Sequence, residues 1–213
     1  MEKRMFKVYA KNDEKIQLKV IPGHFVTSQS HITHYMDMTT MKTRCAEAGR
    51  IAAVLAQRYE ATTPVDSIIC LDGLEVVGAF LAEELAQAGV LSMNAHKTIY
   101  IVTPEFHQNG QILFRDNIQH MIRNRNVVIL MGSITTGVTL HQCMESVLYY
   151  GGKIQGVSAI FSAVNKVAGI DINAVFHKQD IPNYESYHAQ DCPMCKKQEK
   201  IDAIVNGYGY SKL

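Results

Sequence analysis

The sequence lacks a surplus of charge of either sign, because its 213 residues carry 21 Lys and Arg against 20 Asp and Glu. Broad electrostatic docking onto nucleic acid or an anionic membrane needs a basic surplus, so the composition argues against both kinds of partner. Hydrophobic residues make up 47% of the chain and charged residues 19%, which is typical of a globular domain. A chain of this length is expected to bury a sizeable core as one domain.

Signals for export and for membrane insertion are missing as well. The segment Met1 to Lys7 is charged and no apolar segment follows it, so no signal peptide is visible. The uncharged run Asn126 to Met144 is interrupted by Gly132 and Gly137, which favours a strand, a loop and a helix over a membrane span. The five cysteines are odd in number and three lie in apolar patterns, which favours a reducing cytoplasm over a disulfide framework.

Short apolar runs alternate with helical patterns along the chain. Strands are expected at Phe6–Tyr9, Gln17–Val20, Ser67–Leu71, Thr98–Val102, Ile112–Phe114, Val127–Met131, Ile154–Phe161 and Ala174–Phe176. Helices are expected at Thr39–Tyr59, Glu75–Ala88 and Val138–Tyr150. Asn109-Gly110 is a hairpin turn signal. The inward faces are expected to hold Val76, Ala79, Phe80 and Leu85 in the second helix, and Leu140, Met144, Val147 and Leu148 in the third.

This order predicts an α/β fold with a parallel sheet, helices on both faces and right-handed crossovers. We expect one domain in three parts: a small N-terminal β element (1–38), the α/β core (39–178) and an irregular, polar C-terminal tail (179–213) with a CxxC pair. Ligands of such sheets bind at the carboxyl ends of the strands. The loops Asp72–Glu75 and Gly132–Thr139 are therefore the first places to look for a site.

The loop after the most apolar strand is rich in small and hydroxyl residues. Gly137 permits close backbone approach, and the N–H groups that follow it lack partners at the start of a helix. These donors, the threonine hydroxyls and the positive helix end suit a phosphate monoester. The alternative is a plain threonine cap with a glycine turn. The candidate phosphate-binding residues are Ser133, Thr135, Thr136, Gly137, Val138 and Thr139.

A family resemblance follows from three segments. Ile134-Thr135-Thr136-Gly137-Val138-Thr139, placed after a buried strand, resembles the phosphoribosyl-diphosphate motif of the type I phosphoribosyltransferases. Gly23-His24-Phe25-Val26-Thr27-Ser28 and Asp191-Cys192-Pro193-Met194-Cys195-Lys196 are similar to N- and C-terminal stretches of orotate phosphoribosyltransferases. The three matches, in this order, span roughly residues 20–197.

The resemblance implies a five-stranded parallel sheet with a hood built from the N-terminal segment. It implies transfer of ribose-5-phosphate from phosphoribosyl diphosphate to a pyrimidine base, with Mg²⁺ and release of pyrophosphate, in nucleotide synthesis. Thr135, Thr136, Gly137 and Thr139 would hold the 5′-phosphate of phosphoribosyl diphosphate or a nucleoside monophosphate. Thr27 and Ser28 would lie near the base, and the protein would be a cytoplasmic homodimer.

The sequence departs from the family pattern where the chemistry occurs. The family's two acidic residues before Thr-Thr-Gly, which bind the ribose hydroxyls, are replaced by Met131 and Gly132. The mobile loop, usually basic, reads 103–111 here, without Lys or Arg, and leaves His107 as its candidate catalytic residue or as a solvated loop residue. Asp72 and Glu75 either replace the missing acids as sugar or metal ligands or belong to a turn and a helix start.

The segment after Thr27 and Ser28 departs from the family pattern as well. Gln29 and Ser30 stand where a Gly-Lys pair is expected, which weakens the match to orotate itself.

Cys192 and Cys195 form a CxxC in the polar tail, with His188 four residues upstream. Two thiolates and an imidazole suit three ligands of a tetrahedral zinc, with the fourth from His177, from a second subunit or absent. A redox pair and a purely structural role are the alternatives.

Three functions remain open from the sequence. The first is an orotate-type phosphoribosyltransferase. The second is a non-catalytic nucleotide or sugar-phosphate binding or regulatory protein on the same fold, because the ribose-binding acids and the basic loop are missing. The third is a structural protein whose threonine loop is a capped turn, although three threonines and a glycine exceed what capping requires.

Overall fold

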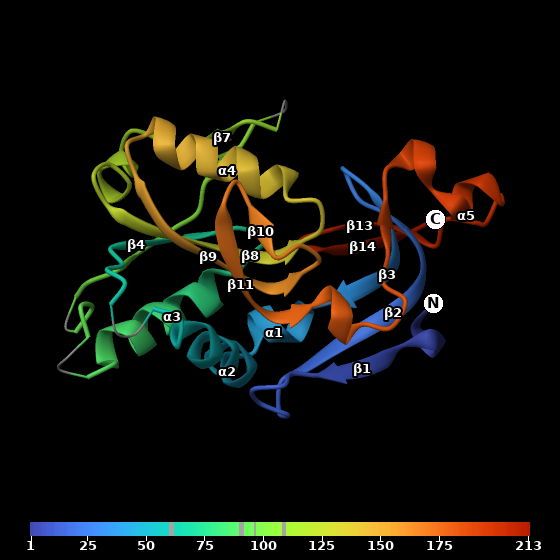
Figure 1. The fold of residues 1–213 in the computed structure, drawn as a ribbon, viewed down its shortest axis with the longest axis horizontal. Helices are drawn as coiled ribbons and strands as arrows, with labels where there is room; N and C mark the ends of the chain where they lie inside the picture. Colours follow the sequence, from blue (N-terminus) through green and yellow to red (C-terminus); the bar gives the residue numbers. More distant parts are fainter. Residues whose placement is uncertain (60–61, 90–91, 96, 108–109) are drawn as a thin grey trace.

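Five parallel strands form the centre of the chain (Figure 1). The computed structural model describes residues 1–59, 62–89, 92–95, 97–107 and 110–213. The sheet order is β11-β9-β8-β4-β5, and a short β10 pairs antiparallel with β11. The strands are β4 (Ser67–Cys70), β5 (Tyr100–Val102), β8 (Asn126–Ile134), β9 (Lys153–Ser162), β10 (Lys166–Val167) and β11 (Ile170–His177). The five parallel strands that the family resemblance implies are confirmed.

Helices cover both faces of this sheet because its strands are apolar on both sides. α4 (Val138–Tyr149) lies on one face, and α2 (Cys45–Ala56) and α3 (Glu75–Gln87) lie on the other (Figure 1). Alternate residues of β8 divide between the two cores: Val127 and Ile129 pack on the α4 side, and Val128 and Leu130 on the α2 side. The run 126–144 is thus a strand, a turn and the start of a helix. Within the described residues no helix has the length and apolar character needed to cross a membrane.

All three expected helices differ in detail. The segment expected as one helix, 39–59, is divided into α1 (Thr39–Thr43) and α2 by Arg44, whose backbone is extended. In α3 the buried positions include Val77, Leu81 and Leu85, and Phe80 packs partly buried against the same core. The expected inward face was therefore wrong at Val76, which is 38% exposed, and at the exposed Ala79. In α4 the expected face is confirmed except for Leu148, which is 59% exposed.

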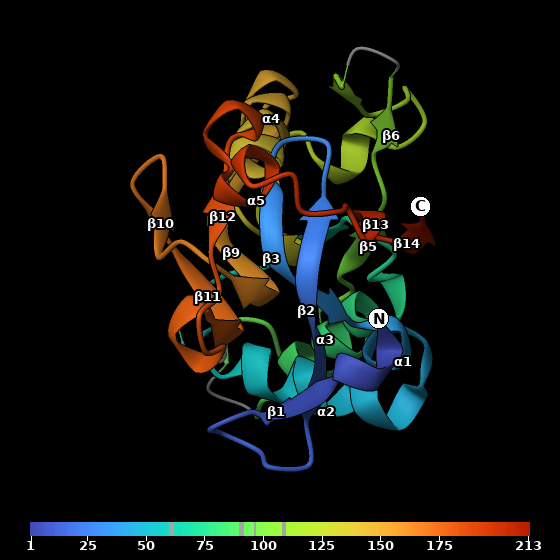
Figure 2. The same cartoon turned by 90° about the vertical axis from the view of Figure 1, so that its right-hand side faces the viewer.

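A second sheet forms a hood beside the carboxyl edge of the first (Figure 2). Its order is β12-β3-β2-β13-β14, and β1 also pairs with β2. The strands are β1 (Phe6–Tyr9), β2 (Gln17–Val26), β3 (His31–Asp37), β12 (Ser186–Tyr187), β13 (Ala203–Asn206) and β14 (Gly209–Lys212). The tail expected to be irregular therefore supplies three of the hood strands.

Short elements complete the chain. The hairpin of β6 (Glu105–Phe106) and β7 (Ile112–Leu113) brackets the predicted Asn109-Gly110 turn, of which Asn109 lies outside the described residues. One-turn helices are η1 (Glu2–Arg4), η2 (Gln119–Met121), η3 (Lys178–Asp180), η4 (Ala189–Asp191) and α5 (Pro193–Lys196).

Candidate functional site

A pocket of about 650 Å³ lies where the carboxyl ends of β4 and β8 meet the hood. This is the edge at which parallel α/β sheets bind ligands. Five segments line it: the β2–β3 loop with β3 and α1, the turn after β4, Phe106 of β6, the turn between β8 and α4 with its flanks, and the β13–β14 hairpin. Among the described residues that line it, Lys42 and Asp72 are the charged ones.

The end of β8, the turn that follows and the start of α4 supply all six residues predicted to bind phosphate to the pocket wall: Ser133, Thr135, Thr136, Gly137, Val138 and Thr139. His141 N–H donates the first backbone bond of α4, to the Gly137 carbonyl. Within the described residues, the N–H groups of Thr136 to Thr139 have no backbone acceptor, and the hydroxyls of the three threonines have no partner. Amide and hydroxyl donors therefore converge at a positive helix end, as an anion site requires.

Gly137 is needed for the shape of this turn. Its φ is 83°, a conformation that glycine adopts without strain. A Cβ at this position would lie 2.7 Å from Val167 Cγ2, on the side of β10. The packing against Val167 is therefore a reason for glycine here, and the close approach of a phosphate to Gly137 stays a prediction.

Asp72 lies beside the position that lacks the family's acids. Its Oδ2 accepts the Gly132 N–H at 3.0 Å, so a carboxylate reaches the end of β8 from the turn after the neighbouring strand β4. Asp72 holds a φ of 59°, which allows this approach within a tight turn. Glu75 is exposed, accepts a hydrogen bond from the Thr103 hydroxyl and does not line the pocket. The structure therefore brings Asp72, and not Glu75, to the site.

Lys42 is a site residue that the sequence did not reveal. It is 9% exposed, and its ammonium group donates to the carbonyl oxygens of Asp72 at 2.7 Å and Gly207 at 2.5 Å. Burial lowers the pKa of Lys42, and nearby carboxylates, with Asp72 first, oppose that shift. Lysines on helices are usually solvated, so nothing in the sequence marks this one as buried.

The β13–β14 hairpin is the second contribution that the sequence analysis missed. Residues 205–209 line the pocket, and a Cβ on Gly207 would overlap the Asp72 carboxylate. The Asn206 side chain accepts the N–H groups of Tyr208 and Gly209 at 2.9 and 3.1 Å, which closes the turn. The signal was present, since Asn-Gly between alternating residues is typical of a hairpin.

The two residues expected near the base differ in their chemistry. Thr27 and Ser28 both line the pocket. The Thr27 hydroxyl is engaged inside the β2–β3 loop, where it donates to the Ser30 carbonyl at 2.9 Å and accepts the Ser30 N–H at 2.8 Å. Ser28 and Gln29 are therefore the side chains of this loop that are left to meet a ligand.

His107 does not line the pocket, which leaves its predicted catalytic role without support. It is exposed, and its backbone N–H and carbonyl bond to Gln111 and Gly110 within the β6–β7 hairpin. The neighbouring Phe106 lines the pocket instead. An ion pair between Arg115 and Glu105, 2.6 Å apart, ties the base of the hairpin.

The CxxC lies close to two histidines, but they are not the expected ones. Cys192 and Cys195 meet His24 of β2 and His31 of β3. His188 is exposed and caps the one-turn helix η4, outside this group. The predicted zinc ligand His188 is therefore wrong, because the tail turns back onto the hood and faces β2 and β3 with its cysteines. His177, considered as a fourth ligand, is also outside the group.

Comparisons with known proteins agree with this geometry. No family model matches the chain. An orotate phosphoribosyltransferase of Pelotomaculum thermopropionicum is 24% identical over 190 residues, which cover 88% of this chain and 90% of that protein. An orotate phosphoribosyltransferase of Carboxydothermus hydrogenoformans is 25% identical over 179 residues, which cover 83% of this chain and 85% of that protein.

Solved structures show the same fold at low identity. Orotate phosphoribosyltransferase from Aeropyrum pernix has a TM-score of 0.53 at 17% identity, covering 75% of this chain and 88% of that one. Leishmania donovani UMP synthase has a TM-score of 0.54 at 15% identity, covering 75% of this chain and 34% of that one. Fold and pocket position together show that this chain has the type I phosphoribosyltransferase fold, and its sequence is similar to those of orotate phosphoribosyltransferases.

Proposed function

We propose that the protein transfers ribose-5-phosphate from phosphoribosyl diphosphate to a pyrimidine base. The observation that carries the proposal is one pocket that joins the threonine turn of α4, the ends of β4 and β8, and the β2–β3 loop of the hood. A nucleotide has its phosphate, sugar and base in this order. The proposal assigns the phosphate to Thr135–Thr139, the ribose to the ends of β4 and β8, and the base to the hood side.

The hood side of the pocket suits a flat ring with polar edges. Tyr35, Met38, Phe106 and Tyr208 contribute apolar and aromatic surface, and Ser28 adds a hydroxyl at its rim. Burial raises the pKa of Tyr35 to about 12, so its phenol stays protonated and able to donate at neutral pH. Aromatic surface with a few hydrogen-bonding groups is a common way to hold a base.

Asp72 is the carboxylate that this proposal assigns to the ribose. Positive charge develops on the sugar during transfer of a phosphoribosyl group, and a fixed carboxylate beside it stabilises that charge. The Gly132 N–H holds one Asp72 oxygen in place at 3.0 Å.

The described residues of the pocket fit a Mg²⁺ ion poorly by themselves. They offer a single carboxylate, Asp72, one oxygen of which already accepts a backbone N–H. Mg²⁺ is usually held by one or two carboxylates together with substrate phosphates and water. The diphosphate of the substrate would therefore have to supply most of its ligands here.

The test is a pyrophosphate-release assay on the purified full chain with Mg²⁺, phosphoribosyl diphosphate and orotate or uracil. Release that depends on the base supports transfer. In parallel, thermal unfolding is measured with ribose-5-phosphate, UMP and inorganic phosphate. We expect UMP to raise the melting temperature most, since it fills both the phosphate turn and the hood side.

A second candidate is a nucleotide-binding protein of the same fold without turnover. It is favoured by the charge of the pocket, where the described lining has one Lys and one Asp, too little positive charge for a diphosphate and a 5′-phosphate together. A nucleoside monophosphate carries less charge and suits this lining better. Stabilisation by UMP without pyrophosphate release from any base would select this candidate.

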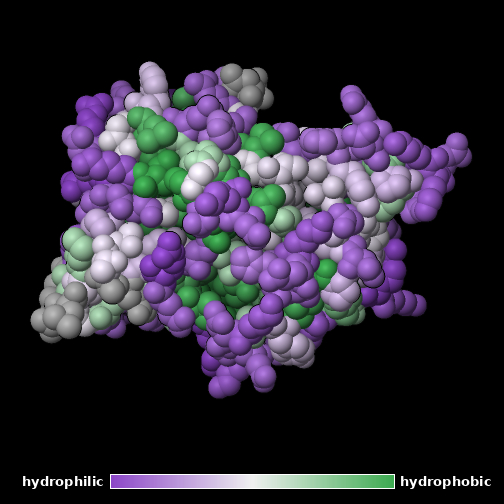
Figure 3. Space-filling view, viewed as in Figure 1, coloured by the Kyte–Doolittle hydropathy of each residue, from purple (hydrophilic) through white to green (hydrophobic). Residues whose placement is uncertain are grey.

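We also propose a cytoplasmic homodimer, as the resemblance implies. The five cysteines are free thiols, which fits a reducing compartment. Apolar side chains gather over α4 on the face shown in Figure 3, and Val138, Leu148 and Tyr149 of this helix are 40%, 59% and 83% exposed. Light scattering of the purified chain gives the mass and tests the dimer directly.

A further inference from the structure

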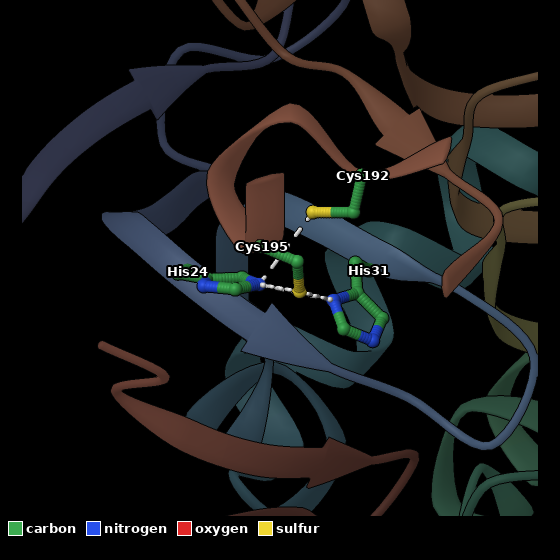
Figure 4. A group of neighbouring side chains, drawn as sticks. All are labelled: His24, His31, Cys192 and Cys195. Carbon is green, nitrogen blue, oxygen red and sulfur yellow. Dashed lines mark hydrogen bonds between the residues drawn. The ribbon is translucent and has the colours of Figure 1, made fainter. Parts of the chain in front are cut away.

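Four side chains from opposite ends of the chain meet beside the hood (Figure 4). His24 lies in β2, His31 in β3, and Cys192 and Cys195 lie at the start and within the single turn of α5. One ligand atom from each of the four lies within 4.8 Å of every other. The sequence separation between His24 and Cys192 is 168 residues, so the group is created by the fold and not by a local motif.

The distances match the edges of a small tetrahedron. Sγ of Cys192 and of Cys195 each lie 3.6 Å from His24 Nε2, and Cys195 Sγ lies 3.3 Å from His31 Nδ1. Zinc bonds of about 2.3 Å to sulfur and about 2.0 Å to nitrogen give a sulfur–nitrogen edge of about 3.5 Å in a tetrahedron. The two imidazole nitrogens are 2.9 Å apart, somewhat shorter than the edge of about 3.3 Å expected with a metal between them.

The tautomer of His24 directs its lone pair into the group. His24 Nδ1 lies 3.0 Å from the Glu199 carbonyl oxygen, which only accepts hydrogen bonds, so Nδ1 carries the proton. Nε2 is then an acceptor that faces His31 Nδ1 and both sulfur atoms at once. Metal-bound histidines typically donate their second ring N–H to a carbonyl or carboxylate in this way.

Burial separates this group from a chance surface cluster. Cys192 has no exposed surface, His24 is 3% exposed and His31 is 9% exposed, whereas Cys195 is the least buried of the four. One nitrogen, His24 Nε2, stands within hydrogen-bonding distance of three neighbours and can accept a proton from only one well-directed donor. A cation at the centre satisfies all four atoms together.

We propose that this chain binds one Zn²⁺ through His24 Nε2, His31 Nδ1, Cys192 Sγ and Cys195 Sγ. Two thiolates with two imidazoles in a tetrahedral arrangement are the ligand set that zinc prefers. Binding releases the two thiol protons to solvent, so the neutral site forms from Zn²⁺ and two thiolates. All four positions are taken by protein, which makes the site structural rather than catalytic.

The metal would fasten the C-terminal tail to the hood next to the pocket. The loop between the two histidines contains Thr27, Ser28 and Gln29, which line the pocket. Zinc would therefore set the position of this wall, and any effect of zinc on nucleotide binding rests on the proposed function. The existence of the metal site does not, because metal content is measured without substrate.

The experiment uses the full chain without an affinity tag that binds metal. Elemental analysis is expected to give one zinc per chain. Replacement by Co²⁺ is expected to give the intense visible bands and sulfur-to-cobalt charge transfer of a tetrahedral thiolate site. Removal of the metal by a chelator is expected to lower the melting temperature by on the order of 10 °C, because a tightly bound ligand stabilises only the folded state.

Matched variants locate the ligands. Cys195→Ser and His31→Gln are expected to lose the stoichiometric zinc and the cobalt spectrum. Cys45→Ser and His188→Gln change the same residue types outside the group and are expected to keep both. The cobalt spectrum of the wild-type chain decides the matter even if a ligand variant fails to fold.

Three results would overturn the proposal. The first is a wild-type chain that is free of zinc and gives no tetrahedral cobalt spectrum. The second is loss of metal from the two control variants to the same degree as from the ligand variants. The third is a Cys192–Cys195 disulfide found by mass spectrometry in the native protein, which would select a redox pair instead.

Discussion

At the scale of single residues, the site receives a carboxylate from an unexpected segment, the turn after β4. Met131 and Gly132 stand where the family has two acidic residues, so the sequence leaves these two positions without a carboxylate. In the structure Asp72, in the turn after β4, accepts the Gly132 N–H, and Lys42 donates to the Asp72 carbonyl. A side chain at 132 would crowd Asp72 and Lys42, since a Cβ there would lie 3.2 Å from atoms of both. The position of the Asp72 carboxylate therefore depends on the glycine at 132.

A matched pair of variants distinguishes the roles of Asp72 and Glu75. Asp72→Asn keeps an oxygen for the Gly132 N–H and tolerates the φ of 59°, so we expect a stability loss of about 1 kcal/mol or less. Under the proposed transfer reaction, we expect the rate of pyrophosphate release to fall on the order of 10²-fold, because a charge beside the sugar is lost. Glu75→Gln is the control and is expected to leave the rate unchanged. If Asp72→Asn released pyrophosphate at the wild-type rate and Glu75→Gln did not, Glu75 would be the carboxylate that acts on the sugar.

The threonine turn gives a second prediction at this scale. Thr136→Val keeps the shape of the side chain and removes a hydroxyl that has no partner among the described residues. A hydrogen bond to a charged group contributes about 1.5–3 kcal/mol, so the affinity for UMP is expected to fall about 10- to 100-fold. Calorimetric titration measures this change.

Thr103→Val is the control for that substitution, because the Thr103 hydroxyl donates to Glu75 away from the pocket. Its affinity for UMP is expected to match that of the wild type. Equal affinities in both variants would show that the Thr136 hydroxyl does not contact the phosphate.

At the scale of helices and strands, most elements could be predicted, but not every buried face. The order of strands and helices followed from alternating apolar runs, and β1 (Phe6–Tyr9) matched to the residue. α3 is apolar nearly all round, with Val76 and Val77 adjacent, so its pattern does not choose a face. The choice is made by Gly78, which brings the helix against Cys70 of β4. Such a contact depends on the partner strand and is not encoded in the periodicity of the helix.

Two helical glycines test this packing. Replacing a glycine inside a helix by alanine adds about 1 kcal/mol of helix propensity. At Gly49 the added Cβ would meet Phe80 at 3.7 Å, an ordinary contact, so Gly49→Ala is expected to stabilise the fold by up to about 1 kcal/mol. At Gly78 it would overlap the buried Cys70 sulfur, so Gly78→Ala is expected to destabilise the fold by about 1–2 kcal/mol. Urea unfolding of both variants measures the difference, and equal stabilisation would contradict the packing of α3 on β4.

At the scale of the whole molecule, the sequence did not reveal that the two ends of the chain build one sheet. β13 pairs in parallel with β2, and Phe25 is opposite Ala203. Asp202 accepts the His24 N–H at 3.0 Å and pairs with Arg4 at 2.6 Å, and Glu2 accepts bonds from Tyr210 and Lys212. Pairings across nearly 200 residues depend on the finished fold. The threonine turn was predictable because its residues are contiguous, whereas Lys42, the hairpin 203–212 and the His–Cys group are assembled from distant segments.

Removing the last hairpin tests this closure. A chain ending at Asp202 loses the buried side chains of Ala203 and Val205, the ladder to β2 and the Gly207 carbonyl that accepts from Lys42. Burial of two small apolar side chains together with these bonds contributes about 3–5 kcal/mol, so the melting temperature is expected to fall by on the order of 10 °C. UMP is expected to lose most of its stabilising effect, because residues 205–209 form one wall of the pocket.

A chain lacking only Leu213, which is 60% exposed, is the control and is expected to behave as the full chain. If the chain ending at Asp202 melted at the same temperature and still responded to UMP, the hairpin would be an appendage, and the pocket would have to be closed by the remaining segments alone.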